Sequence, residues 1–285
     1  STLTLGLARI DAPDALFGLY LAVALVMLVM FVLRQRTVSD PLLPMSMFRS
    51  MPFNAANGTH LLIGGALIIG MVTIPLMANT VLALTPLEGG LMLMRMTAAV
   101  PIGAVLGGFA AQRLGYRLPT ISGLAFIAVG FWFMSRWGLD VADPSMTVHL
   151  ALAGFGFGLL IAPIALAATN SVDAGLRGAA AALITAMRMV GMTFGLATLT
   201  AWGTGRFQEL VAGMTLPLPM PGDTAEQAAE RLSDFQTRLT DAGLSLFSDF
   251  YLIAMAVSVV AIAVAVFMSR GSGVETDETQ PDVDV

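Results

Sequence analysis

The chain has 285 residues, of which 56% are hydrophobic and 12% are charged, with a formal net charge of −5 at pH 7. Soluble domains carry about 25% charged residues, so this composition excludes an ordinary soluble domain and indicates a polytopic membrane protein. There is no cysteine, which excludes disulfides and thiolate metal sites, and no basic cluster indicates binding to nucleic acid.

The apolar stretches predict an all-α polytopic membrane protein. Seven of them are long enough to cross a bilayer as helices, and no strand-like alternation competes with them. They cover residues 15–33, 56–82, 88–111, 119–137, 147–169, 178–202 and 249–269. Residues 1–14 are interpreted as the end of a truncated helix and an outside loop, so we expect the chain to be a fragment of a longer protein.

Arginine placement predicts a multi-pass protein of the cell (inner or cytoplasmic) membrane with a cytoplasmic C-terminus. If the first helix ends inside, the short inside segments hold Arg34, Arg36, Arg49, Arg113, Arg117, Arg177 and Arg270. The connection 34–54 is expected to be a basic, proline-broken link at the cytoplasmic membrane surface. The tail 271–285 is acidic without a base, which predicts disorder.

The connection 203–248 is the one sizeable extracytoplasmic loop of the predicted topology. Within it, Thr224 and Gln227 fit a capping box. An apolar stripe at helical spacing follows, made of Ala228, Leu232, Phe235 and Leu239. We expect an amphipathic helix that rests like a lid on the outer surface.

The helix 56–82 carries a polar and helix-breaking stripe within an arc of about 100°. Its members are Asn57, His60, Gly64, Met71, Pro75 and Asn79. Such a stripe should face a partner helix or an aqueous cavity. The alternative for Asn57, His60 and Asn79 is that they simply lie at the membrane interfaces, close to the helix ends.

Two further helices carry residues whose roles the sequence pattern does not decide. Arg95, two turns inside the helix 88–111, either lines a cavity or snorkels to the outer interface. The G-x-x-x-G spacing of Gly103 and Gly107 favours close helix packing. In the helix 147–169 the helix-thinning and helix-bending residues are Gly154, Gly156, Gly158 and Pro163. They predict a bendable helix that suits a gate, although close packing alone would also select glycine.

The helix 178–202 places Arg188 near the middle of the bilayer, where an arginine costs about 2.5–3.5 kcal/mol on insertion scales. We therefore expect Arg188 to face protein or water. The residues on its face are Thr185, Gly191, Met192 and Gly195. The two glycines are expected to serve helix packing or bending and to leave space for the guanidinium or for a ligand, and we interpret this face as functional.

Several residue types are missing from the membrane core. No aspartate or glutamate lies at mid-membrane depth. His60 is therefore the side chain at that depth that could titrate near neutral pH. No Ser/His/Asp set, phosphate loop or metal-ligand cluster is visible in the sequence. We therefore expect neither an enzyme nor a metal or other cofactor.

The loop between the third and fourth helices reads Gly108-Phe-Ala-Ala-Gln112-Arg113-Leu-Gly115-Tyr-Arg117. It resembles the cytoplasmic G-x-L-A-D-R-x-G-R-R motif of the major facilitator superfamily. Four further segments occur in the order of the second half of the fourteen-helix drug:proton antiporters of the EmrB/QacA type: DPLLPMSMFRSMPF, TPLEGGLML, GFGFGLLIAP and LRGAAAALITAMRMVGMTFG. The resemblance covers residues from about 15 to 269.

The resemblance implies that residues 55–270 form the six-helix C-terminal bundle, that 15–33 is a linker helix, and that an N-terminal six-helix bundle is missing. It also implies a gating role for the loop residues Gly108, Arg113, Gly115 and Arg117. Two positions depart from the family: Gln112 stands where the motif has aspartate, and Arg95 stands where relatives often have proline.

These observations predict the C-terminal half of a proton-coupled exporter of small amphipathic molecules or drugs that works by alternating access. Its partners would be the substrate, protons, the N-terminal bundle and the lipid bilayer. The cavity and coupling residues would be Arg188, Thr185, Met192, Asn79, Met71, Arg95 and His60. The alternatives are a transporter of an anionic or lipid-like substrate, and a non-transporting membrane fragment or scaffold.

Overall fold

The structure is a computed structural model that describes residues 44–216 and 224–268, with scattered positions between 23 and 34. Within these ranges the chain is helical without a strand, which confirms the all-α prediction. The long helices are α3 (Met51–Thr80), α4 (Pro86–Leu114), α5 (Arg117–Met134), α6 (Ser145–Thr169), α7 (Arg177–Val211) and α8 (Ala225–Ala265). All six are long and apolar enough to cross a membrane. The predicted helix 15–33, the segment 1–14 and the tail 271–285 lie mostly or wholly outside the described residues.

Local chemistry sets the helix starts. The predicted link 34–54 ends at Ser50, because the Ser50 hydroxyl accepts from the Phe53 amide and Pro52 lies in the first turn, so α3 begins at Met51. A short 3-10 helix, η1 (Met47–Arg49), precedes it, and another, η2 (Ala174–Leu176), precedes α7. Thr85 and Glu88 form a full capping box at the start of α4.

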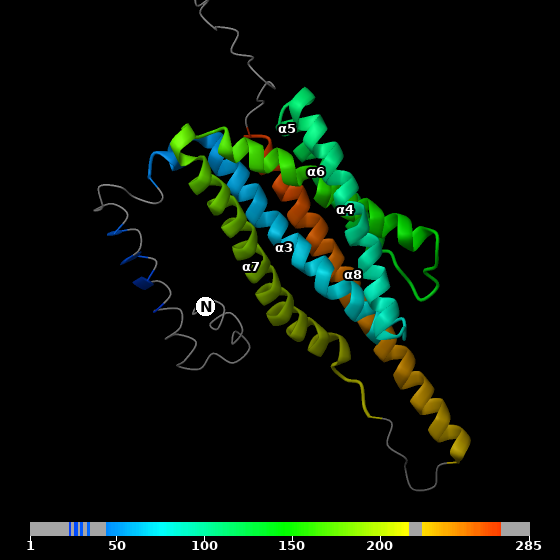
Figure 1. Cartoon of the computed structure of the whole chain (residues 1–285). Helices are drawn as coiled ribbons and strands as arrows, with labels where there is room; N and C mark the ends of the chain where they lie inside the picture. Colours follow the sequence, from blue (N-terminus) through cyan, green and yellow to red (C-terminus); the bar gives the residue numbers. More distant parts are fainter. Residues whose placement is uncertain are drawn as a thin grey trace, which may run out of the picture.

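The segment 203–248 is helical over most of its length, so the predicted helix bounds on both sides of it are wrong. The helix that was expected to end at residue 202 continues as α7 to Val211, and the helix that was expected to begin at 249 begins at Ala225. The predicted capping box of Thr224 and Gln227 is confirmed, but it starts α8 itself and not a separate lid helix. No proline interrupts the segment 225–248, so the helix runs on without a break. Figure 1 shows the N-terminal end of α8 running past the other helices.

The six helices pack as two similar units of three. α4 packs against α6 in the way that α7 packs against α3, and α5 packs against α6 in the way that α8 packs against α3 (Figure 1). Exchanging α3, α4 and α5 for α6, α7 and α8 therefore maps the main helix pairs onto one another. α4 and α7 are the least buried of the six helices, and α6 is the most buried.

The centre of the bundle is aromatic. The Tyr251 ring on α8 stacks on Phe131 of α5 with 6.2 Å between centroids, and both side chains are fully buried. The Tyr251 hydroxyl contacts the sulfur of Met77 on α3 at 3.6 Å. This cluster joins α3, α5 and α8, so the packed centre lies on the side of α3 away from α7.

Candidate functional site

The crossing of α3 and α7 brings together part of the predicted site. A methyl group added at Gly64 would overlap the carbonyl oxygen of Arg188, and one added at Gly191 would overlap the carbonyl oxygen of Leu61. The two backbones therefore touch, which only glycine permits. The expected packing role of Gly191 and Gly195 agrees with these contacts, whereas the expected space beside Arg188 is wrong, because α3 fills it.

Arg188 lies at the edge of this crossing. Its side chain is half-buried, and among the described residues the guanidinium makes no hydrogen bond and no ion pair. Met192, one turn further along, is also half-buried, whereas Thr185 is exposed and donates its hydroxyl to the Ala181 carbonyl at 3.0 Å. The face of α7 that holds Arg188 thus points partly away from the bundle, and no described residue bonds to the guanidinium there.

His60 lies within electrostatic range of Arg188 and is 4% exposed. Its Nδ1 lies 2.8 Å from the carbonyl oxygen of Ile184 on α7, so the imidazole spans the crossing. Asn57 donates its amide to the Phe53 carbonyl at 2.9 Å. In the described part of the chain, the buried atoms Asn57 Oδ1, Thr59 Oγ1 and His60 Nε2 have no hydrogen-bond partner. Thr59 was not singled out from the sequence, because a threonine on a spanning helix ordinarily bonds to its own backbone.

Met71 and Asn79 lie further along α3 and are both exposed. At 1.5 Å per residue they are about 10 Å and 22 Å beyond Gly64 along the helix axis. The structure therefore does not bring them together with Arg188 and His60. Their assignment to a cavity stays a prediction.

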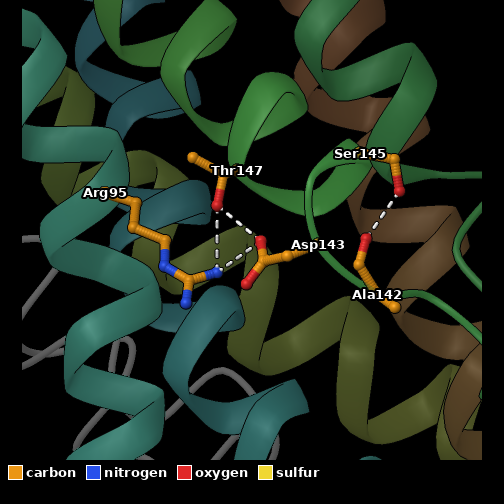
Figure 2. Close-up of polar contacts among 5 residues, drawn as sticks. All are labelled: Arg95, Ala142, Asp143, Ser145 and Thr147. Atoms are coloured by element: carbon orange, nitrogen blue, oxygen red, sulfur yellow. Dashed lines mark hydrogen bonds and ion pairs between the residues drawn. The ribbon is translucent and has the colours of Figure 1, made fainter.

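Arg95 lies in a separate polar cluster (Figure 2). Its Nη1 is 2.8 Å from the Asp143 carboxylate, in the loop between α5 and α6, and 3.1 Å from the Thr147 hydroxyl on α6. Thr147 in turn donates to Asp143. These bonds hold the pKa of the Asp143 carboxyl below its usual 3.8, first through the Thr147 hydroxyl and then through the Arg95 charge. Sequence reasoning missed Asp143 and Thr147 because both lie about 50 positions from Arg95, at a loop and a helix start where polar residues are ordinary.

The loop motif lies between α4 and α5. Gly115 ends α4 with a φ of 76°, a left-handed conformation that favours glycine. Arg113 is exposed, whereas Gly108 and Arg117 are half-buried. Tyr116 accepts from the Asn170 amide at 2.6 Å, which ties this loop to the end of α6. The predicted gating role of the motif stays a prediction.

The glycines of α6 pack against two neighbours. A methyl group at Gly154 or Gly158 would overlap the α4 backbone, and one at Gly156 would press on α5. α6 is continuous through Pro163, from Ser145 to Thr169. The structure therefore supports close packing for these glycines, and bending at Pro163 stays a prediction.

A second charged site lies between α7 and α8, in the segment predicted as a loop. Arg206 bonds to Asp249 at 2.9 Å and to Glu209 at 3.3 Å. These three residues border a pocket of about 480 Å³, whose other lining residues are Trp202, Leu252, Ile253 and Ala256. A pocket of about 410 Å³ at the opposite end is lined by η1 and by the connection between α6 and α7. Across the described residues, no group of three or more His, Asp or Glu side chains is arranged to hold a metal ion.

The chain is similar to mycobacterial proteins named as triacylglyceride transporters. It is 34% identical to one from Mycolicibacterium smegmatis and 33% identical to one from Mycolicibacterium hassiacum, over 92% of this chain in both cases. A relative from Mycobacterium tuberculosis is 36% identical over 62% of this chain and 36% of its own length. The chain spans about half the length of the first two relatives, 48% and 51%. No family model matches the chain.

Proposed function

We propose that this chain is the C-terminal half of a membrane exporter of lipid-like molecules that works by alternating access. The observation that carries the proposal is that Arg188, half-buried in the span of α7, has no hydrogen-bond or ion-pair partner among the described residues. An isolated charge at that depth is costly unless it faces a polar cavity or a counter-charge. The similarity to proteins named triacylglyceride transporters, over 92% of this chain, supports a lipid-like cargo.

The facing wall of the cavity would be an N-terminal six-helix bundle. α4 and α7 are the least buried helices, which makes them the natural contact surface for such a bundle. The chain covers about half of its relatives, in keeping with one bundle of two. Resemblance to the major facilitator superfamily supports rocking of the two bundles about a midplane site. In this arrangement the bundle lies in the cytoplasmic membrane with its C-terminus inside.

The positive charge of Arg188 limits which molecules the site would favour as substrates. Arg188 lies within the span of α7, and a cation suits a neutral or acidic amphiphile better than a cationic drug. Proton coupling would use a carboxylate of the N-terminal bundle that pairs with Arg188. Export of drugs, the first expectation from the sequence, remains compatible with the same machinery but has no such support from charge.

Flux in proteoliposomes tests this proposal. Arg188→Ala in the full transporter should lower lipid export by about tenfold or more, since hydrogen bonds to charged groups contribute about 1.5–3 kcal/mol. Arg177→Ala is the matched control, because Arg177 is exposed at the start of the same helix. Unchanged export with Arg188→Ala, at equal protein stability, would remove Arg188 from the mechanism. Export of a cationic dye in preference to a neutral glyceride would favour the drug alternative.

A further inference from the structure

The two close helix crossings of the bundle use the same register. In each, two glycines four residues apart on one helix face two backbone carbonyls four residues apart on the other. The glycines Gly103 and Gly107 of α4 face the carbonyls of Phe155 and Leu159 on α6, and Gly191 and Gly195 of α7 face those of Leu61 and Gly65 on α3. Each position of one crossing therefore has a defined counterpart in the other.

This register assigns counterparts to Arg188 and His60. Gly158 faces the carbonyl of Val100 just as Gly64 faces that of Arg188, so Arg188 stands in the place of Val100. One turn earlier, Gly154 faces the carbonyl of Met96, and the matching carbonyl, that of Ile184, is bonded by His60. His60 thus stands in the place of a glycine.

Asn57 and Thr59 have small apolar counterparts by the same register, Ala151 and Ala153. The α4–α6 crossing is therefore built from Gly, Ala and Val where the α3–α7 crossing carries four polar side chains. Packing does not require these polar side chains, because the same chain packs the same geometry without them. Three of the four bury an atom without a partner, which opposes stability. Local features that oppose stability are expected at functional sites.

Hydrogen-bond chemistry defines what these side chains accept. The Ile184 carbonyl can only accept, so His60 Nδ1 carries the proton, and Nε2 of the neutral ring is a bare acceptor. Asn57 uses its amide donor on Phe53, which leaves Oδ1 as a second acceptor one turn away on the same face. Arg188 has five N–H donors, and side chains on a helix lean toward its N-terminus, here toward the level of Ile184 and His60.

We propose that His60 Nε2 and Asn57 Oδ1, which have no partner in this structure, are positioning acceptors for a docked state in which the Arg188 guanidinium swings from the undocked position seen here onto α3. Resting on the proposed function, this gives Arg188 two alternative sites: the acceptors on α3, and a carboxylate or an anionic headgroup on the cavity side. A proton added to Nε2 turns that acceptor into a donor, so protonated His60 releases Arg188 toward the cavity. The docked site therefore exists only while the imidazole is neutral.

Among the described residues, no acidic side chain acts on His60. α3 packs against α4, α6, α7, α8 and η1, whose charged residue is Arg49, and the charged group that acts on His60 is Arg188. The other titratable or charged side chains on the described parts of those helices are Glu88, Arg95, Arg113, His149, Arg177, Arg206, Glu209, Tyr251 and the groups of α8 before residue 250. None of them acts on His60. The switch between the two Arg188 sites therefore depends on His60 and on whatever anion the cavity supplies.

Nitrogen NMR of the imidazoles tests the docking without any transport measurement. The chain has two histidines, so ¹⁵N-histidine labelling in lipid nanodiscs gives two rings, which His149→Gln assigns. We expect His60 Nε2 to resonate as a hydrogen-bonded acceptor, and Arg188→Met to shift it to the position of a free acceptor. An Nε2 signal that Arg188→Met leaves unchanged, or one that carries the proton in neutral His60, would overturn the proposal.

The α4–α6 crossing supplies a matched variant for a second test. Asn57→Ala, Thr59→Ala and His60→Gly together rebuild that crossing on α3, so the variant should fold and keep its thermal stability. In the full transporter it should lose the acid-side change of its flux–pH profile, and His60→Gln, which keeps an acceptor, should restore activity in part. A wild-type profile in the triple variant would refute the docking site. Absence of any lipid flux in the unmodified transporter would instead refute the proposed function, with the NMR result unaffected.

Discussion

Arg95 is the residue whose charge links α4 to the start of α6. The guanidinium bonds to Asp143 and Thr147, and its side chain remains 32% exposed. The sequence left open whether Arg95 lines a cavity or snorkels to the interface. The observed bonds hold it in the N-terminal half of α4, 12 positions before Gly107 of the α4–α6 glycine contact, and a link between two helices is the role that the contacts support.

This link predicts a pH dependence of stability. The pKa of Asp143 is lower in the folded protein than its usual 3.8, so the ionised carboxylate stabilises the fold above that pH, and this contribution is lost as the pH falls through the folded-state pKa. We expect Asp143→Asn to lower the melting temperature in detergent near neutral pH, and the difference from wild type to shrink below pH 3.8. Asp140→Asn is the control, since Asp140 is an exposed carboxylate of the same loop. An equal effect of both variants would contradict the role of the link.

The glycines of α7 give a second prediction at this scale. An added methyl at Gly191 overlaps the Leu61 carbonyl, and overpacking of this kind costs about 1–3 kcal/mol, so Gly191→Ala should lower stability by that amount. Gly205→Ala on the same helix meets open space and should be neutral or stabilising by up to about 1 kcal/mol. Thermal unfolding in detergent compares the two. If both variants had the same stability, the backbone contact would not be tight.

Residue patterns predicted the glycine packing of α4 and a packing or bending role for Gly191 and Gly195, but not that α3 fills the space expected beside Arg188. The reason is physical: helical periodicity says which residues share a face, and not which helix covers it. A glycine beside an arginine can leave room for the guanidinium or admit a neighbouring backbone. Only the position of α3 decides between these two possibilities.

At the scale of elements, the predicted spans agree with the structure where the sequence is continuously apolar. α4, α5 and α6 begin and end within a few residues of the predicted bounds. α7 and α8 differ because hydropathy detects the part of a helix that is apolar on all sides, and these helices continue into polar sequence. α8 has 41 residues, so it is about 61 Å long, twice the thickness of a hydrocarbon core of about 30 Å.

The continuous α8 and the proposed orientation make a labelling prediction. The chain has no cysteine, so single cysteines can be introduced without removing native ones. In intact cells, Ser233→Cys in the N-terminal half of α8 should react with a membrane-impermeant maleimide. Ser171→Cys, between α6 and α7, should react only after permeabilisation. The reverse pattern would invert the proposed topology.

At the scale of the whole molecule, the repeated three-helix unit explains why so few residues organise the bundle. One glycine register, used at the α4–α6 and α3–α7 crossings, sets both close contacts. The sequence contains all of these glycines, but the repeat is hidden because the helices of the two units are paired across the bundle and share little sequence. His60 was singled out from the sequence as a polar residue at depth, while its counterpart Gly154 was singled out for bending, and nothing in the sequence relates the two.

The isolated chain should fold but should not transport. One bundle has no facing wall to rock against, so we expect proteoliposomes with the 285-residue chain to show no lipid flux. The full-length relative from Mycolicibacterium smegmatis serves as the positive control. Robust flux from the 285-residue chain would contradict the assignment to half of a transporter.

The long N-terminal part of α8 has a mechanical consequence. Residues 225–241 are mostly exposed, and the buried residues of α8 begin with Ala242, so this part of the helix extends about 25 Å beyond them. A tilt of the bundle, as rocking transport would produce, moves the far end of this segment sideways more than it moves the residues packed in the bundle. A molecule attached to the tip would therefore sense the state of the membrane-embedded bundle from well outside the bilayer.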